Sequence, residues 1–196
     1  VERSSYEESP LGRVEWIKLY GLLTGHLDEA EQFFHSSVQQ VQAVEQERGN
    51  DETERPTVVF FYFTASGYAN VRTPNDYISQ MIELAGGSYA FSADELGEQG
   101  SRSTVNMDPE QFYAAAKDAD ILIYNSTVEG ALPSLDALLE KSPLLKNCRA
   151  VSTGNVFCTG QNMFQQVSGT AEMISDLHAV ISGDTEQPLT FLYRLQ

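Results

Sequence analysis

The chain has 196 residues and a mass of 21.7 kDa, with 41% hydrophobic and 20% charged residues, which suits one domain or two small ones. A chain of this length buries roughly 70% of its unfolded surface. Disordered chains and scaffolds that depend on disulfides are therefore excluded. The 12 Lys+Arg against 28 Asp+Glu give a net charge of −16. This charge repels phosphate backbones and anionic lipids, which excludes a basic nucleic-acid-binding surface and adsorption to an anionic membrane.

The cysteines and histidines do not form a metal-binding pattern. We predict that Cys148 and Cys158 are reduced, buried thiols, with a disulfide across a hairpin as the alternative. His26, His35 and His178 are scattered and lack the spacing of zinc ligands. The sequence also contains no apolar run of about 18 residues that could span a bilayer. It therefore predicts neither a resident metal nor a membrane-spanning helix.

The first quarter of the chain is predicted to be helical. Residues 10–24 and 27–41 carry apolar side chains three or four positions apart, with Pro10 opening the first pattern and Gly25 ending it. Residues 47–56 contain no apolar side chain and read as a solvated connector. We predict a helical segment over 1–48 and a connector over 49–56. The apolar stripe of the second helix, formed by Phe34, Val38 and Val41, is expected to be partly exposed.

Strands and helices alternate from residue 57 onward. Residues 57–63 (TVVFFYF) predict a central strand that is buried on both faces. Further strands are predicted near 89–91, 120–124 and 189–195, and helices over 75–85, 108–116, 134–139 and 167–181. Residues 150–158 read as two short strands that meet at Thr153 and Gly154. The alternation predicts an α/β fold, in which residues 57–196 form a three-layer Rossmann-like lobe with a largely parallel central sheet.

The usual catalytic signatures are absent from the sequence. It contains no phosphate-binding glycine loop, no nucleophile elbow and no paired-cysteine motif. In open α/β sheets, ligands bind beyond the carboxyl ends of the strands, and the loops 64–73, 125–133 and 159–165 leave such ends. Their hydrogen-bonding and aromatic groups suit a bulky, partly anionic small molecule. The candidate ligand-binding residues are Tyr68, Asn70, Arg72, Asn125, Ser126 and Asn162, with Arg102 as a further candidate.

One expectation concerns how these candidates are arranged. Arg72 is expected to point into the cleft, with Tyr68 and Asn125 nearby, and to bind an anionic group. The alternative for Arg72 is an ion pair with a local carboxylate. The alternative for the other candidates is that they belong to ordinary solvated loops.

Several segments in the same order resemble a known family. Residues 10–18 (PLGRVEWIK) are similar to the interlobe helix of substrate-binding proteins for iron-complex and cobalamin ABC transporters. Residues 77–87 (YISQMIELAGG) and 104–112 (TVNMDPEQF) resemble two further segments of that family, as do 155–157 (NVF) and 174–178 (ISDLH). The resemblance spans almost the whole chain.

The resemblance implies two α/β lobes joined by a long helix, with the ligand clamped between them. This chain would supply the interlobe helix and the C-terminal lobe. The N-terminal lobe, the export signal and the lipid-anchoring cysteine would lie in a preceding part, so that the protein would be a periplasmic or cell-surface lipoprotein.

The implied function is capture of an iron complex and its delivery to an ABC permease, without catalysis and without a resident cofactor. A ferric siderophore, haem, cobalamin or another chelate all fit as the ligand. By resemblance, Glu110 would dock on the permease, with Asp108 as the alternative. Two other functions stay open from the sequence: a flavodoxin-like or chelatase-like enzyme domain, and an interaction module without a ligand.

Overall fold

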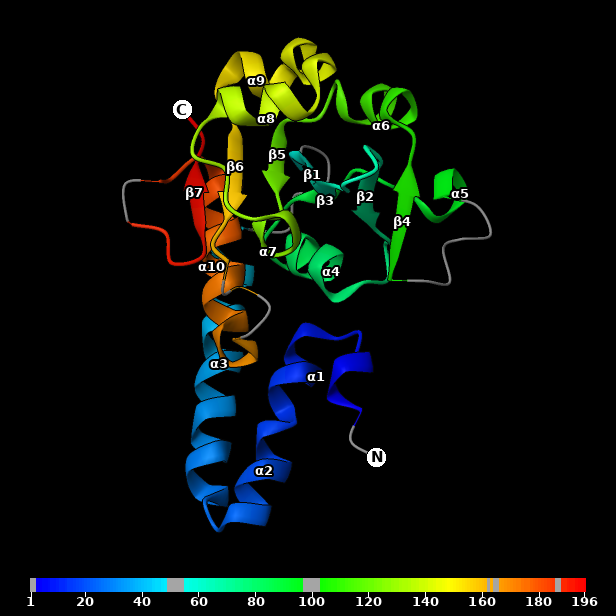
Figure 1. Cartoon of the computed structure of the whole chain (residues 1–196). Coiled ribbons are helices and arrows are strands. Elements are labelled where there is room, and N and C mark those ends of the chain that lie inside the picture. Colours follow the sequence, from blue (N-terminus) through cyan, green and yellow to red (C-terminus); the bar gives the residue numbers. More distant parts are fainter. Residues whose placement is uncertain (1–2, 49–54, 97–102, 162, 164–165, 186–187) are drawn as a thin grey trace.

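The structure, a computed structural model, describes residues 3–48, 55–96, 103–161, 163, 166–185 and 188–196. Its N-terminal part is a helical base that projects from an α/β lobe (Figure 1). The helices of the base are η1 (Ser4–Tyr6), α1 (Pro10–Glu15), α2 (Ile17–Thr24) and α3 (Leu27–Glu47). The prediction of a helical segment is confirmed, with a break at Trp16 and a left-handed Gly25 between α2 and α3.

The described strands form one seven-stranded sheet in the order β4-β2-β1-β5-β6-β7, with β3 beside the start of β1. The strands β1, β3, β5 and β6 are parallel, whereas β2 and β7 pair antiparallel to their neighbours. The bounds are β1 (Thr57–Phe63), β2 (Ala69–Arg72), β3 (Ser88–Tyr89), β4 (Thr104–Met107), β5 (Ile121–Tyr124), β6 (Val156–Thr159) and β7 (Leu192–Arg194).

Helices cover both faces of this sheet, so the predicted three-layer α/β fold is confirmed. The C-terminal half of α3 packs with α4 and α10 on one face, and α6, α8 and α9 lie on the other. The bounds are α4 (Tyr77–Leu84), α5 (Ala93–Leu96), α6 (Pro109–Ala116), α7 (Ser126–Glu129), α8 (Leu135–Lys141), η3 (Pro143–Asn147), α9 (Arg149–Thr153), η5 (Val167–Gly169) and α10 (Thr170–Ser182).

The central strand β1 shows why the sequence requires two helical layers. Successive side chains of a strand point to opposite faces. Val58 and Phe60 accordingly join the cluster under α4 and α10, whereas Val59, Phe61 and Phe63 join the cluster under α6 and α8. All five residues are buried. Because both sets are apolar, the strand is stable only between two layers, as its uninterrupted apolar run predicted.

Two predicted segments are corrected by the structure. Residues 64–73 do not form an open loop, because the chain turns at Gly67 and returns as β2, which pairs with β1 and β4. Residues 150–158 are not two short strands. Residues 149–153 form α9, Gly154 ends it in the left-handed region, and only β6 is extended. Cys148 and Cys158 are free and buried, as predicted.

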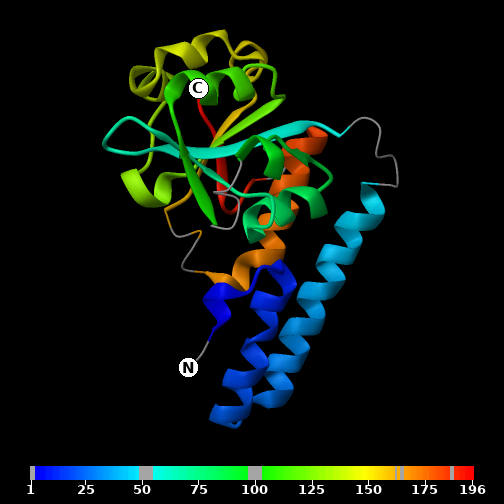
Figure 2. The ribbon, with the colours of Figure 1, turned by 90° about the vertical axis from the view of Figure 1, so that its right-hand side faces the viewer.

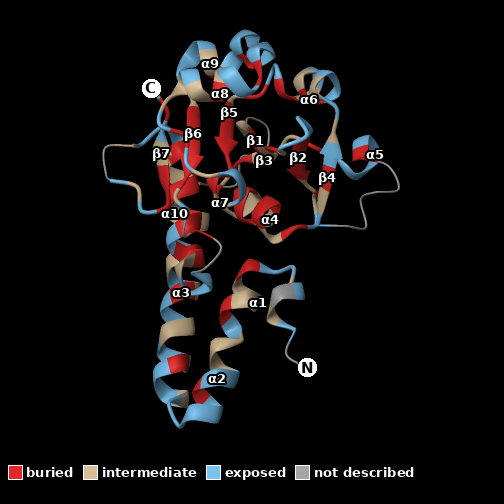
Figure 3. Cartoon of the chain, in the orientation of Figure 1, coloured by how far each residue is buried: buried red, intermediate tan, exposed pale blue. Residues whose placement is uncertain are grey.

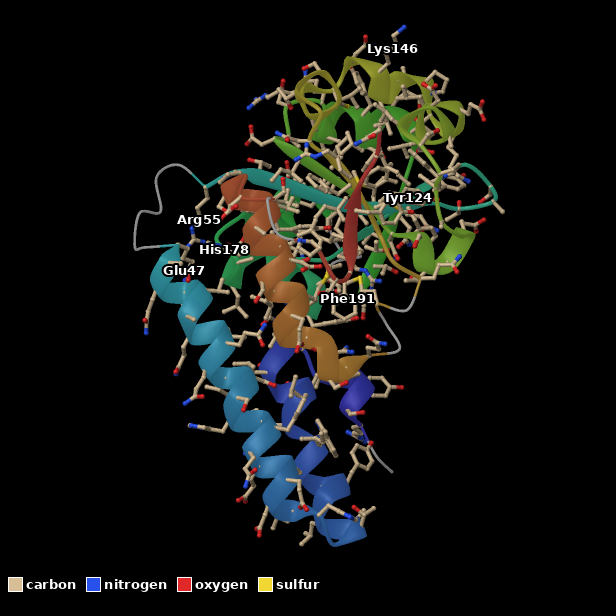
Figure 4. The ribbon with its side chains drawn as sticks, turned by 90° about the vertical axis from the view of Figure 1, so that its left-hand side faces the viewer. Glu47, Arg55, Tyr124, Lys146, His178 and Phe191 are labelled. Atoms are coloured by element: carbon tan, nitrogen blue, oxygen red, sulfur yellow. The ribbon has the colours of Figure 1, made fainter. Side chains whose placement is uncertain are left out.

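The base joins the lobe through the C-terminal half of α3 and through α1, which contacts α4 and α10. Gln40 Nε2 donates to Ser175 Oγ of α10 at 3.0 Å, and Arg48 Nη1 donates to the Glu83 carbonyl oxygen of α4 at 2.6 Å. His178 of α10 donates from Nδ1 to the Ala85 carbonyl oxygen at 2.9 Å, and its Nε2 lies 3.7 Å from Glu47 Oε2. Figures 2 and 4 show α3 running alongside α10 toward this junction.

The distal part of the base is much less buried than the lobe (Figure 3). On α3, Val41 is buried, and Phe34 and Val38 are half-buried, so the stripe is partly exposed, as expected. Apolar side chains are more exposed on α2, where Leu22 is 62% and Leu23 is 73% exposed.

Candidate functional site

The adjacent parallel strands β1, β5 and β6 end at one edge of the sheet, which we call the carboxyl edge. The described residues that follow them are 64–68, 125–129 with α7, and 160, 161 and 163. Two hydrogen bonds tie these strand ends together. The Asn125 backbone N–H donates to the Phe61 carbonyl oxygen at 2.7 Å, and the Ser126 N–H donates to Thr159 Oγ1 at 3.0 Å. The ends of these three strands are therefore joined at the carboxyl edge.

Asn125 and Ser126 lie at the centre of the carboxyl edge and are both buried. Asn125 caps α7, since its Oδ1 accepts hydrogen bonds from Thr127 N–H at 3.1 Å and Thr127 Oγ1 at 2.6 Å. Its Nδ2 is buried without a hydrogen-bond partner among the described residues. The Ser126 hydroxyl donates to the Thr159 carbonyl oxygen, so this side chain holds two strand ends together.

Tyr68 and Asn70 lie on the hairpin that follows β1. The Tyr68 side chain is 43% exposed beside the turn. Asn70 is buried in β2, where its Nδ2 donates to Asn106 Oδ1 at 2.7 Å. Its Oδ1 is buried without a hydrogen-bond partner among the described residues. Unpartnered buried polar atoms are rare in folded proteins and call for an explanation such as a functional role.

The expectation that Arg72 lies with Tyr68 and Asn125 was wrong. Because residues 69–72 form a strand, Arg72 lies four residues from Tyr68, roughly 13 Å along the extended chain. Its Nη1 lies 3.6 Å from Oδ2 of the buried Asp76, which caps α4 through a hydrogen bond from Ile78 N–H. Burial raises the pKa of Asp76, and the Arg72 guanidinium opposes that rise. The local ion pair was the alternative reading of Arg72.

The two remaining ligand-binding candidates, Arg102 and Asn162, lie outside the described residues. The proposed docking residues are both exposed. Glu110 lies in the first turn of α6, and Asp108 is the N-cap residue of that helix, with Pro109 at the first helical position. The docking prediction requires that Glu110 be exposed, and it is. The role of Glu110 in docking stays a prediction.

Sequence reasoning missed an apolar component of the carboxyl edge. Val128 on α7 is 54% exposed. Together with Tyr68, it gives the segments that follow β1 and β5 one exposed apolar side chain each. The signal was available, because Val128 stands in the predicted loop 125–133, but sequence reasoning singled out the polar residues there.

Within the part of the chain that the structure describes, we find no group of three or more His, Cys, Asp and Glu side chains placed to bind a metal ion. Among the same residues, no helix is both long enough and apolar enough to cross a lipid bilayer.

The three-layer fold and the carboxyl edge are those of an α/β ligand-binding lobe. Comparison with known proteins identifies its family. Residues 4–163 match the model of the periplasmic binding protein family, so the chain belongs to that family. The predicted family is confirmed. The chain is also 28% identical over 177 residues to an uncharacterised lipoprotein of Methanocaldococcus jannaschii, a match that covers 89% of this chain and 40% of the relative.

Solved structures of the same fold include three binding proteins. The apo periplasmic haem-binding protein RhuT from Roseiflexus sp. RS-1 superposes with a TM-score of 0.70 at 19% identity, covering 90% of this chain and 64% of that one. The TroA-like periplasmic binding protein FepB from Veillonella parvula superposes with a TM-score of 0.70 at 13% identity, and the match covers 95% of this chain and 62% of that one. Staphylococcus aureus IsdE, solved with haem, superposes with a TM-score of 0.66 at 15% identity, and the match covers 88% of this chain and 65% of that one. The chain thus spans less than two-thirds of each relative's length.

Proposed function

We propose that this chain is the interlobe helical segment and the C-terminal ligand-binding lobe of an extracytoplasmic solute-binding protein. The protein captures an iron complex and delivers it to an ABC import permease. Membership of the periplasmic binding protein family and the haem-binding relatives of the same fold support this function. The ligand is the cargo of the protein, and no catalytic step is involved.

The observation that carries the proposal is the composition of the carboxyl edge. Three neighbouring strand ends meet there, and the segments that follow β1 and β5 each present an exposed apolar side chain, Tyr68 and Val128. The polar atoms Asn70 Oδ1 and Asn125 Nδ2 lie close to the same strand ends and lack partners among the described residues. Small-molecule sites combine apolar contacts with a few polar groups that fix the ligand's orientation. The carboxyl edge has both components.

We propose further that a second lobe completes the cleft. The chain spans 62% to 65% of the solved relatives described above, so their remaining third has no counterpart in it. The exposed apolar side chains of α2, which include Leu22 and Leu23, would pack against that second lobe. The carboxyl edge would then form one wall of the cleft.

Delivery requires a membrane partner and an extracytoplasmic location. The family and the lipoprotein relative support a location outside the cytoplasm, either in the periplasm or at the cell surface. We propose that Glu110, or Asp108 beside it, forms an ion pair with a basic residue of the permease. Charges at the rim of an interface act mainly on the association rate. Glu110→Lys should therefore slow uptake without changing the affinity for the ligand in solution.

The proposed function is tested by ligand titration of the full protein encoded by the gene, with its second lobe. The ligands are a ferric hydroxamate siderophore, haemin and cobalamin, and the readout is isothermal titration calorimetry. We expect saturable binding of one of these chelates, weakened about tenfold by Tyr68→Ala and by Val128→Asp, because each removes apolar contact area.

The matched control is Leu144→Asp, which changes a 37% exposed side chain of η3, away from the carboxyl edge. It should leave the affinity unchanged. Absence of binding for all three ligands, or equal weakening by the control, would contradict the proposed function.

A further inference from the structure

The edge of the sheet at which β5 and β6 begin, which we call the amino edge, carries basic side chains. Arg149 Nη1 lies 2.7 Å from Oδ1 of Asp120, the residue directly before β5. Arg194 donates from Nη1 to the carbonyl oxygen of Gly154, which lies just before β6. Two guanidinium groups are therefore held at the edge opposite the carboxyl edge.

The carboxyl edge has a different set of charges. The first charged residue after β5 is Glu129, and the first after β6 is Glu172. The first after β1 is Arg72, whose positive charge lies 3.6 Å from the Asp76 carboxylate. The chain therefore leaves the ends of β5 and β6 with negative charges, and the end of β1 with a locally balanced pair.

The exposed side chains of the carboxyl edge are mostly uncharged. Among the described residues that follow its three strands, they are those of Ala65, Ser66, Tyr68, Val128, Glu129 and Gln161. Glu129 is the only charged member of this set. The buried Asn125 Nδ2, which lacks a partner among the described residues, is a neutral amide donor. A ligand at this edge would thus meet apolar surface, neutral hydrogen-bonding groups and one carboxylate.

Glu129 is placed to act on a ligand at the carboxyl edge. It is the last residue of α7, and α7 lies against β1 and β6, the strands on either side of β5. Its side chain is exposed beside Val128, one of the apolar residues of the proposed site. Burial raises the pKa of the Tyr124 phenol, and the Glu129 carboxylate adds to that rise, so the charge of Glu129 acts on the end of β5.

These observations bear on the charge of the ligand. An anion that approaches the carboxyl edge meets Glu129 in a chain whose net charge is −16, and like charges repel. Neutral amides and hydroxyls satisfy the hydrogen bonds of an uncharged ligand, but they do not compensate an anion that is taken out of water. The surface is therefore unfavourable for an anionic group and favourable for a neutral or cationic one.

We propose that the carboxyl edge selects chelates whose facing surface carries no negative charge, with Glu129 as the residue that discriminates on charge. The inference deepens the proposed function and rests on it for the ligand being a metal chelate. An uncharged or cationic complex fits this surface, whereas haem with its propionates and a ferric tris-catecholate do not. A cationic group of the ligand would pair with the Glu129 carboxylate.

The test compares chelates that share one metal centre and differ in the charge of one group. Ferrioxamine B carries a free ammonium group, its N-acetyl derivative carries none, and its N-succinyl derivative carries a carboxylate instead. Aquocobalamin and cyanocobalamin compare a cation with a neutral complex on one corrin. In calorimetric titrations of the full protein encoded by the gene, affinity should fall about threefold with each step toward negative charge, the size expected for one exposed ion pair. Haemin and a ferric tris-catecholate should bind more weakly than the neutral chelates.

Glu129→Gln tests the assignment to one residue, because it removes the charge and keeps the size of the side chain. Each step should then shrink to less than about 1.5-fold. Raising the salt concentration should reduce the steps of the unaltered protein in the same way, since exposed charges are screened. The matched control is Glu140→Gln, which removes the same charge from an exposed position in the last turn of α8, away from the carboxyl edge (Figure 1). Steps that persist in Glu129→Gln, or that the control reduces equally, would overturn the role of Glu129.

The same panel separates this inference from the proposed function. If haemin or the tris-catecholate binds more tightly than the neutral and cationic chelates, the inference is wrong and the proposed function stands. If a neutral or cationic chelate binds most tightly and Glu129→Gln removes the dependence on charge, both are supported. If no chelate of any charge binds, the proposed function is wrong and the inference fails with it.

Discussion

The lobe and the helical base use apolar residues in different ways. In the lobe, all four residues of β5 and all four of β6 are buried between two helical layers. In the base, α3 buries Val41 and Val44 against the lobe, whereas α2 leaves Leu22 and Leu23 exposed. The core of the lobe is thus covered on both faces, with Val41 and Val44 of α3 completing one of them, whereas one face of α2 is left uncovered. Apolar side chains stabilise the chain where a neighbouring layer buries them, as in the lobe, and not where they face solvent, as on α2.

The largest expected effect follows directly from this difference. Leu122 of β5 is completely buried, so Leu122→Ala should lower the free energy of unfolding by about 2–5 kcal/mol through lost burial and the cavity left behind. Leu22→Ala, at a side chain that is 62% exposed, should change it by less than about 0.5 kcal/mol. Urea denaturation followed by circular dichroism measures both. Similar losses in the two variants would contradict the comparison.

The next effect concerns the closure of the lobe by its last strand. Asp176 of α10 accepts hydrogen bonds from Phe191 N–H at 2.6 Å and Leu192 N–H at 3.3 Å, which fixes the start of β7. Asp176→Ala would leave both donors without this acceptor and should cost about 2 kcal/mol. The same denaturation measurement checks it, and an unchanged free energy of unfolding would show that these two bonds are dispensable.

Asp176 should also make the stability depend on pH. Burial raises its pKa in the folded state above the ordinary value of about 3.9. The folded chain therefore binds the proton more tightly than the unfolded chain, and this contribution is complete below the unfolded-state pKa. It is lost as the pH rises through the folded-state pKa. The stability of the unaltered chain relative to Asp176→Asn should fall over that interval, and a rise would contradict the assigned shift.

A smaller and more local effect is expected in the base. A Cβ on Gly21 of α2 would lie 2.6 Å from Ala30 Cβ of α3 and 2.8 Å from the His26 carbonyl oxygen. Gly21→Val should therefore separate the two helices at a cost of about 1–2 kcal/mol, and leave the lobe intact. Hydrogen exchange should increase in α2 and the first half of α3 only. The control is Leu23→Val, which introduces the same side chain at an exposed position of the same helix.

The smallest effect on stability is expected from the exposed face of α2. The double variant Leu22→Glu and Leu23→Glu should leave the unfolding free energy nearly unchanged, because both side chains already face solvent. It should suppress self-association of the isolated chain, since an exposed apolar face promotes it. Light scattering at increasing concentration measures this. Equal self-association of the unaltered chain and the double variant would show that α2 does not mediate self-association.

The elements that the sequence predicted well carry strong periodic signals. The seven-residue run of β1, the one-sided stripe of α3 and the serine that caps α8 each specify their own structure. The short elements were missed because neighbouring segments determine them. Ala69–Arg72 has no strand pattern of its own and is extended because β1 and β4 pair with it. Residues 149–153 resemble a strand by composition, yet Gly154 ends them as a helix.

The candidate site divides in the same way. The position of Asn125 and Ser126 at the carboxyl edge was predicted, because they directly follow the predicted strand 120–124. The position of Arg72 depended on whether residues 64–73 were a loop or a hairpin, and the sequence favoured the wrong choice. Exposure of Val128 depends on what packs around it in three dimensions, which residue spacing does not reveal.

The central claim is that the carboxyl edge of this lobe is one wall of a ligand cleft, and one titration tests it most directly. The full protein encoded by the gene, which we propose has two lobes, and its Tyr68→Ala, Val128→Asp double variant are titrated with the chelate that binds most tightly, with Leu144→Asp as the control. The account predicts saturable binding that the double variant weakens by about a hundredfold, if the two tenfold losses are additive, and that the control leaves unchanged. Equal affinity in the unaltered protein and the double variant would contradict it.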